Sequence, residues 1–160
     1  MLGPLSKADQ LGYFGSDGNL WSNREVGLST IPDALFFTFA TLKSGRVRLI
    51  PGARRGFVEV EGTPDMILEV VSDTSEQKDT TILKAKCAKA GVSEYWLVDA
   101  RGPEARFEIW TLSEGAYVSN PTADVWQVSA VFRRAFQLRC EKDMLNNPRW
   151  NLLVQPLVQE

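Results

Sequence analysis

Two apolar runs that each contain an acidic residue stand out in the pattern of hydrophobic and polar positions along the chain. Residues 33–42 (DALFFTFATL) are rich in aromatic side chains and lie between Pro32 and a Lys-Ser-Gly turn, which is typical of a buried strand. Residues 64–72 (PDMILEVVS) begin with a proline and have the length of a central strand. The sequence therefore predicts two strands in the interior of a sheet.

A helix is predicted between the second run and a further strand. Thr74 and Gln77 have the spacing of a capping box, and Gly91 follows a segment with helical periodicity, so we expect a helix over residues 75–90. Residues 94–99 (EYWLVD) then have the composition of a strand. A strand, a helix and a strand in this order predict a crossover connection and at least one parallel pair in a mixed sheet.

Hairpins are predicted on both sides of this unit. The segment 47–60 contains two apolar stretches separated by a Pro-Gly turn, and residues 105–112 alternate in polarity before a Ser-Glu-Gly turn. Residues 1–31 contain turn-forming clusters and are expected to form loops with short strands. We therefore expect one α/β (α+β) domain over residues 1–160, with a mixed β-sheet flanked by helices and with β-hairpin extensions.

The composition predicts a folded protein and excludes several kinds of chemistry. Of the 160 residues, 44% are hydrophobic, which is sufficient for a core. The sequence has no histidine, which excludes Ser-His and Cys-His nucleophile pairs and histidine-ligated zinc. Any chemistry must therefore use carboxylates, lysines and hydroxyls. The formal net charge of -2 argues against coating of nucleic acid by bulk positive charge, although a local basic patch is compatible with it.

The sequence predicts a cytoplasmic location. No segment approaches the roughly 20 consecutive apolar residues of a membrane span, so no membrane contact is expected. The N-terminus also lacks the order of a signal peptide. Cys87 and Cys140 are isolated in the sequence, and in the cytoplasm such a pair is expected to be two buried free thiols rather than a disulfide.

Glu69, in the middle of the second apolar run, is the sharpest indication of a functional site. Burial of an unpaired carboxylate is costly, so Glu69 is expected to face a cation, a hydrogen-bond donor or a cleft, while a strand with a wet face is equally compatible. Asp65 points to the same face of a straight strand but lies about 13 Å away. Asp33 is a better partner, because two carboxylates from adjacent strands can bind a hard divalent ion such as Mg²⁺.

The stretch EGTPDMILEVVSDTS, followed by KDTTILKAKCAKAGVSEYWLVDAR, closely resembles the Uma2 family of putative restriction endonucleases, and the similarity covers most of the chain. The family is assigned to the PD-(D/E)XK nuclease superfamily. This resemblance implies a restriction-endonuclease-like mixed sheet and Mg²⁺- or Mn²⁺-dependent hydrolysis of DNA phosphodiester bonds. Carried over to this sequence, it makes Asp33, Asp65 and Glu69 candidate metal ligands, with Asp65 and Glu69 also catalytic.

The lysine of the superfamily is where this sequence departs from the pattern. Val71 stands two residues after Glu69, in the usual lysine position, and Leu83 stands where Uma2 relatives often have a lysine on the helix. Lys84 or Lys86 can substitute as a catalytic residue, whereas the alternative that we favour is that both belong to a solvated helix face. Many relatives also carry an N-terminal segment with a Glu before a Gly-rich turn, for which this chain has no clear match.

Three functions remain open from the sequence. The first is an active Mg²⁺-dependent DNA endonuclease, and the second is a catalytically inactive nuclease-fold module for binding or assembly, which the missing lysines favour. The third is a structural domain whose acids pair with arginines. Arg46, Arg48, Arg54 and Arg55 of the predicted hairpin either contact phosphates or form a solvated strand face. Exposed strand edges are compatible with a homodimer.

Overall fold

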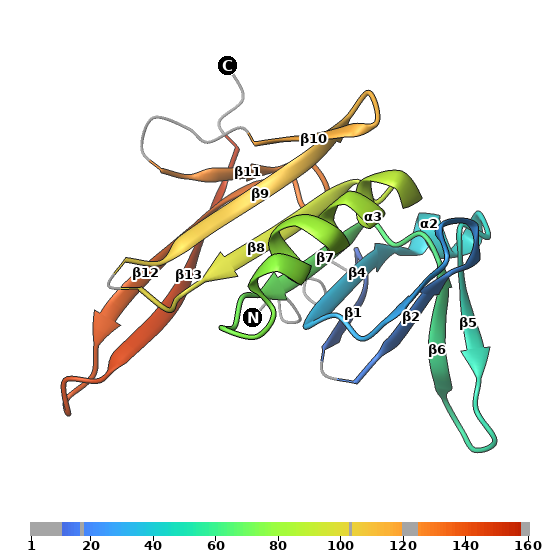
Figure 1. The fold of residues 1–160 in the computed structure, drawn as a ribbon, viewed down its shortest axis with the longest axis horizontal. Helices are drawn as coiled ribbons and strands as arrows, with labels where there is room; N and C mark the ends of the chain where they lie inside the picture. The colour runs from blue at the N-terminus through green and yellow to red at the C-terminus, as the bar shows by residue number, and fades with distance from the viewer. Residues whose placement is uncertain (1–10, 17, 103, 120–124, 158–160) are drawn as a thin grey trace.

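Three β-sheets form most of the structure, a computed structural model that describes residues 11–16, 18–102, 104–119 and 125–157 (Figure 1). The largest sheet has the strand order β1-β4-β7-β8-β9-β10 and is mixed, because β7 and β8 are parallel whereas its other pairs are antiparallel. Its strands are β1 (Gly12–Ser16), β4 (Ala34–Thr38), β7 (Met66–Val70), β8 (Glu94–Asp99), β9 (Arg106–Ser113) and β10 (Ala116–Ser119). The fold is α+β with a predominance of strands.

The crossover from β7 to β8 is the unit that the sequence predicts. After β7 the chain forms the π-helical turn η2 (Lys78–Ile82) and continues as α3 (Leu83–Ala90). The helix ends at Gly91, whose φ of 80° is the left-handed conformation that glycine adopts readily. The predicted helix over residues 75–90 and the parallel strand pair that follows are confirmed. The π-helical turn inside the helix is not predicted by the sequence pattern.

A four-stranded sheet in the order β3-β2-β6-β5 lies beside the large sheet (Figure 1). β5 and β6 are the predicted hairpin and pair antiparallel, whereas β2 and β6 are parallel. The elements of this sheet are β2 (Leu20–Asn23), the 3-10 turn η1 (Arg24–Val26), β3 (Leu28–Thr30), β5 (Val47–Pro51) and β6 (Phe57–Gly62). Short strands are therefore present before residue 32 as expected, and residues 1–10 lie outside the described part of the chain.

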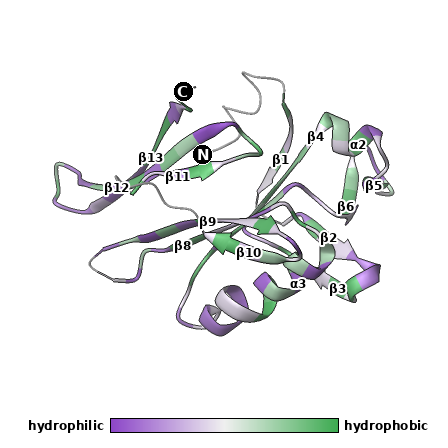
Figure 2. Cartoon of the chain, turned by 90° about the horizontal axis from the view of Figure 1, so that it is seen from above, coloured by the Kyte–Doolittle hydropathy of each residue, from purple (hydrophilic) through white to green (hydrophobic). Residues whose placement is uncertain are grey.

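The third sheet packs on the face of the large sheet that α3 does not cover. Its antiparallel strands are β11 (Gln127–Ser129), β12 (Arg134–Lys142) and β13 (Pro148–Pro156). One apolar cluster fills the space between the two sheets and contains Phe36, Met66, Trp96, Ile109, Phe132 and Phe136. The outer part of the β12–β13 hairpin is largely hydrophilic and projects from the body (Figure 2). Within the described residues, strands rather than helices pack on this face, so the expected flanking by helices is only partly correct.

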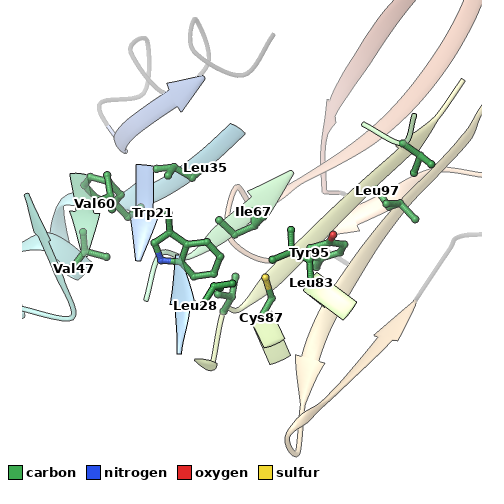
Figure 3. Packing of buried hydrophobic residues seen from close by; sticks show 13 residues of the cluster. Trp21, Leu28, Leu35, Val47, Val60, Ile67, Leu83, Cys87, Tyr95 and Leu97 are labelled. Carbon is green, nitrogen blue, oxygen red and sulfur yellow. The ribbon is translucent and has the colours of Figure 1, made fainter. Parts of the chain in front are cut away.

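A second apolar cluster lies on the α3 side and joins the large sheet, the helix and the small sheet (Figure 3). Trp21 of β2, Ile67 of β7, and Leu83 and Cys87 of α3 pack there, each 3% exposed or less. The burial of Leu83 is important for the site, because this residue occupies the helix position at which relatives often have lysine.

Both faces of β8 carry a buried aromatic side chain. Tyr95 and Trp96 are neighbours in β8 and therefore point to opposite faces, where both are fully buried in the two clusters. Both cysteines are free thiols as predicted, although Cys87 is buried and Cys140 is exposed. In the described part of the chain, no helix has the length and apolar character that a membrane crossing requires.

The strand predicted over residues 33–42 is shorter than expected. β4 ends at Thr38, and the following aromatic and apolar residues form the short helix α2 (Phe39–Lys43). The Thr38 hydroxyl oxygen accepts a hydrogen bond from the Thr41 backbone N–H at 3.1 Å, which caps the first turn of this helix. A capping threonine inside the apolar run therefore ends the strand early.

Candidate metal centre

Asp33 and Glu69 meet at one edge of the large sheet. β4 and β7 are antiparallel with Ala34 opposite Leu68, so the residue before β4 lies beside the end of β7. The Oδ2 atom of Asp33 accepts a hydrogen bond from the Val70 backbone N–H at 2.6 Å. Asp33 is exposed, whereas Glu69 is only 2% exposed. The structure thus places one solvent-facing and one buried carboxylate side by side.

Glu69 points to the helix side of the sheet. Alternate residues of a strand share a face, and Ile67, two residues earlier, packs in the cluster under α3. Burial, together with the negative charges of Asp79 and Asp33, raises the pKa of Glu69 to about 8. A side-chain hydrogen bond with Asp33 acts in the same direction. Without a bound cation, Glu69 is therefore mostly protonated at neutral pH.

Asp79 is a third acid at this position, and the sequence analysis did not identify it as a site residue. It lies in η2 and is 1% exposed. Its Oδ2 atom accepts a hydrogen bond from the Ser75 hydroxyl, and the Tyr95 hydroxyl donates to its backbone carbonyl at 2.7 Å. Asp79 precedes the buried Leu83 and Cys87 at successive four-residue spacings. An acid on the apolar stripe of a helix is the signal that indicates such a residue.

Lys78 supplies a positive charge to the three acids. Its Nζ atom lies 3.2 Å from Asp79 Oδ1, and its side chain is 51% exposed, so it occupies the solvent side of the group. Burial lowers the pKa of Lys78, but the hydrogen bond with Asp79 and the charges of Glu69 and Asp33 outweigh this effect and raise it. The ammonium group therefore stays charged. We refer to Asp33, Glu69 and Asp79 as the acidic cluster.

The acidic cluster has the donor atoms that a hard divalent cation prefers. Glu69 Oε1 is buried without a hydrogen-bond partner, and Asp79 Oδ1 also lacks a hydrogen bond but has the Lys78 ammonium nearby. Such oxygens are costly to bury and are suitable ligands for Mg²⁺. Among the described residues, no group of three acidic or cysteine side chains is arranged so that it could hold a metal ion as it stands. Binding of an ion therefore requires Glu69 to lose its proton and the carboxylates to turn toward the ion.

Asp65 lies apart from the acidic cluster. It precedes β7, at the opposite end of the strand from Glu69, about 13 Å away along the chain. Its carboxylate accepts hydrogen bonds from the Thr38 backbone N–H and the Thr41 hydroxyl, both at 2.7 Å, and Arg46 Nη1 lies 3.7 Å away. These partners tie the start of β7 to the corner between β4 and α2. The structure therefore does not bring Asp65 together with the other two candidate ligands.

The helix lysines considered as catalytic residues lie farther along α3 than the acidic cluster. Lys84 Nζ lies 3.0 Å from the centroid of the Trp110 ring, a cation–π contact, and burial lowers the pKa of Lys84. Lys86 is exposed on α3, about two turns beyond the acidic cluster. Val71 and Leu83, the two positions at which the sequence resemblance implies a lysine, are 4% and 3% exposed and belong to the apolar core.

Comparison with known proteins assigns the family. The family described as Uma2, putative restriction endonuclease, matches residues 1–141. A solved structure of a putative nuclease of DUF820 from Anabaena variabilis has a similar fold, with a TM-score of 0.56 at 18% identity. The similarity covers 82% of this chain but 66% of that chain, so the protein spans slightly less than two thirds of that relative. No protein with a curated description matches. The chain belongs to the Uma2 family of putative restriction endonucleases.

Proposed function

We propose that the chain is an endonuclease that hydrolyses DNA phosphodiester bonds with Mg²⁺ or Mn²⁺ held at the acidic cluster. The observation that carries the proposal is Glu69, a buried carboxylate with an unpartnered oxygen beside two further acids at a sheet edge. Family membership supports a nuclease. The crossover unit with its acids at one sheet edge is compatible with the restriction-endonuclease-like fold that the sequence resemblance implies.

Three carboxylates would hold the ion, because their oxygens are the ligands that Mg²⁺ and Mn²⁺ prefer. When bound, a divalent ion supplies polarisation of the phosphate and lowers the pKa of a water molecule. Glu69 and Asp79 are buried and would supply oxygens from the protein side, whereas Asp33 is exposed and borders the solvent from which a phosphate would approach. Glu69 becomes a ligand only after losing its proton, so it couples metal binding to pH.

We assign the role of the missing family lysine to Lys78. Its ammonium group is half exposed and contacts Asp79, so it can reach an anion that is bound over the cluster. A lysine in this position stabilises negative charge that develops on a phosphate. The charges of one divalent ion and one ammonium group also balance the charge of three carboxylates. This balance favours binding of the ion while Lys78 stays charged beside it.

Nicking of supercoiled plasmid DNA in Mg²⁺ and in Mn²⁺ tests the proposed function. We expect wild type to nick the plasmid and Glu69→Gln to lose activity by on the order of 100-fold. Asp65→Asn is the matched control, because Asp65 is a buried acid close to the same strand but outside the acidic cluster. A folded Asp65→Asn protein should retain nicking close to wild type. Loss of nicking in that variant, with Glu69→Gln unaffected, would contradict the assignment.

A second candidate function is a nuclease-fold module that binds or assembles without cleaving. The observation that favours it is the burial of Val71 and Leu83 at the two positions where the sequence resemblance implies a lysine. In that case wild type would bind Mn²⁺, and Glu69→Gln would lose this binding, but neither protein would nick DNA. Measurement of Mn²⁺ binding and of plasmid nicking with wild type and Glu69→Gln therefore distinguishes the two functions.

A further inference from the structure

Arginine side chains from different elements line one hollow on the small sheet, well away from the acidic cluster. The hollow has a volume of about 530 Å³ and lies between η1, the start of β5 and the end of β6. Arg24 comes from η1, Arg46 from the turn before β5, and Arg48 from β5 itself. We call this site, lined by these arginines and by Glu61, the basic hollow.

A buried carboxylate orients two of the three guanidinium groups. Glu61, at the end of β6, is 7% exposed, and its two oxygens lie 2.9 Å from Arg24 Nε and 2.9 Å from Arg48 Nη2. The Arg24 and Arg48 side chains are 87% and 68% exposed, so these ion pairs contribute little to the stability of the fold. The pairs instead fix two flexible side chains so that they border the same hollow.

The third arginine is fixed by the backbone. Arg46 Nη2 donates to the Gly91 carbonyl at 2.5 Å, and Nη1 faces Asp65 at 3.7 Å. Gly62 opposite has a φ of 111°, and a Cβ atom there would lie 2.2 Å from the Arg46 carbonyl oxygen. Only glycine therefore allows the end of β6 to approach this closely and bring the arginines of β5 and its turn next to Glu61.

The basic hollow has the N–H donors that a phosphate group needs. Its lining contains three arginines and two acids, Glu25 and Glu61, and Asp65 lies 3.7 Å from Arg46 outside that lining. Each guanidinium group has five N–H donors, and Glu61 accepts from one nitrogen each of Arg24 and Arg48. Guanidinium forks bind phosphate oxygens in a bidentate manner.

We propose that the basic hollow binds a backbone phosphate of the DNA whose cleavage the proposed function assigns to the acidic cluster. The helical segment η2–α3 connects the two sites, because Lys78 begins it and Gly91, bonded to Arg46, follows its end (Figure 1). About 13 helical residues span roughly 20 Å. This is the length of about six base pairs of duplex. One duplex lying along α3 can therefore contact both sites.

Fluorescence anisotropy with a labelled duplex of about 20 base pairs, in EDTA, tests this inference without any metal. We expect the double variant Arg24→Gln/Arg48→Gln to bind about tenfold more weakly, with a salt dependence reduced by about one phosphate contact. The matched control is Arg54→Gln/Arg55→Gln, which removes two exposed arginines from the β5–β6 turn outside the hollow. An equal loss in the two double variants would show an effect of bulk charge and would overturn the proposal, as would unchanged binding.

Further measurements distinguish a DNA phosphate from a free phosphate. They also distinguish a failure of this inference from a failure of the proposed function. If wild type does not bind the duplex, but millimolar inorganic phosphate raises its melting temperature and not that of Arg24→Gln/Arg48→Gln, the hollow takes a free phosphate and the DNA assignment is overturned. The anisotropy assay in EDTA requires neither metal nor cleavage, so it tests the hollow independently of the acidic cluster. Failure of nicking alone therefore contradicts the proposed function, whereas failure of the arginine variants to weaken binding contradicts this inference.

Discussion

At the scale of single residues, Glu69 could be predicted as a site residue, whereas two of its neighbours could not. An acid inside an apolar strand is visible in the sequence because burial of a charge needs a physical reason. Asp79 and Lys78 are adjacent in sequence and lie in a helix with several other charged residues, so the pattern alone does not distinguish them. The roles proposed for them are based on the burial of Asp79, which is 1% exposed, and on the ion pair that Lys78 forms with it at the surface.

The raised pKa of Glu69 predicts how stability changes with pH when no metal is bound. The folded protein keeps the Glu69 proton up to about pH 8, whereas the unfolded chain loses it near 4.5. The free energy of unfolding should therefore fall as the pH rises through this window, by on the order of 5 kcal/mol. Glu69→Gln cannot ionise and should lack this fall. Urea unfolding of both proteins in EDTA at several pH values measures the difference, and parallel profiles would contradict the raised pKa.

Substitution of Lys78 tests which lysine assists the reaction. Lys78→Met removes the ammonium group but keeps the length of the side chain, so we expect Mn²⁺ binding to persist while plasmid nicking falls by about 100-fold. Lys84→Met is the matched control, because the Lys84 ammonium lies over Trp110 and away from the acidic cluster. The opposite result, with nicking lost in Lys84→Met and kept in Lys78→Met, would assign the role to Lys84 instead.

At the scale of elements, the local pattern predicts the β7–α3–β8 unit well, because strand and helix periodicities change at clear boundaries. The errors arise where one polar side chain changes the backbone. Thr38 caps a helix inside an apolar run, and η2 adds a π-helical turn that no periodicity indicates. Glu94 is another position whose role the strand pattern does not indicate. Its carboxylate connects the large sheet with the third sheet.

Glu94 is expected to hold the segment after β11 in place. It is fully buried, and its carboxylate accepts hydrogen bonds from Trp96 Nε1, the Ser129 hydroxyl and the backbone N–H groups of Ala130 and Val131. Glu94→Ala leaves these donors unsatisfied, at roughly 1–3 kcal/mol each, so the free energy of unfolding should fall by at least about 3 kcal/mol. Urea unfolding measures this loss.

A control for this prediction is an acid on the exposed end of the third sheet. Glu141→Ala in β12 removes an exposed carboxylate and should change the free energy of unfolding by less than about 0.5 kcal/mol. A change of the same small size in Glu94→Ala would mean that the hydrogen-bonded carboxylate does not hold the third sheet against the large one.

At the scale of the whole molecule, the mixed sheet and its hairpins could be predicted, but the arrangement of three sheets could not. Contacts such as Trp96 with Phe132 and Phe136 join distant segments and leave no trace in local periodicity. The same limit applies to the site. The sequence indicated Asp33 and Glu69 because adjacent strands can bring them together, and it included Asp65 only through the family pattern, although the spacing already placed it about 13 Å away.

Calorimetric titration of Mn²⁺ into the metal-free protein tests the central claim most directly, because it measures the metal site without requiring cleavage. We expect wild type and Asp65→Asn to bind Mn²⁺ with release of a proton near pH 7, which repeats in buffers of different ionisation enthalpy reveal. Glu69→Gln should show neither the binding heat nor the proton release. Equal heats in wild type and Glu69→Gln, or a loss of heat in Asp65→Asn alone, would contradict a divalent-cation site at the acidic cluster.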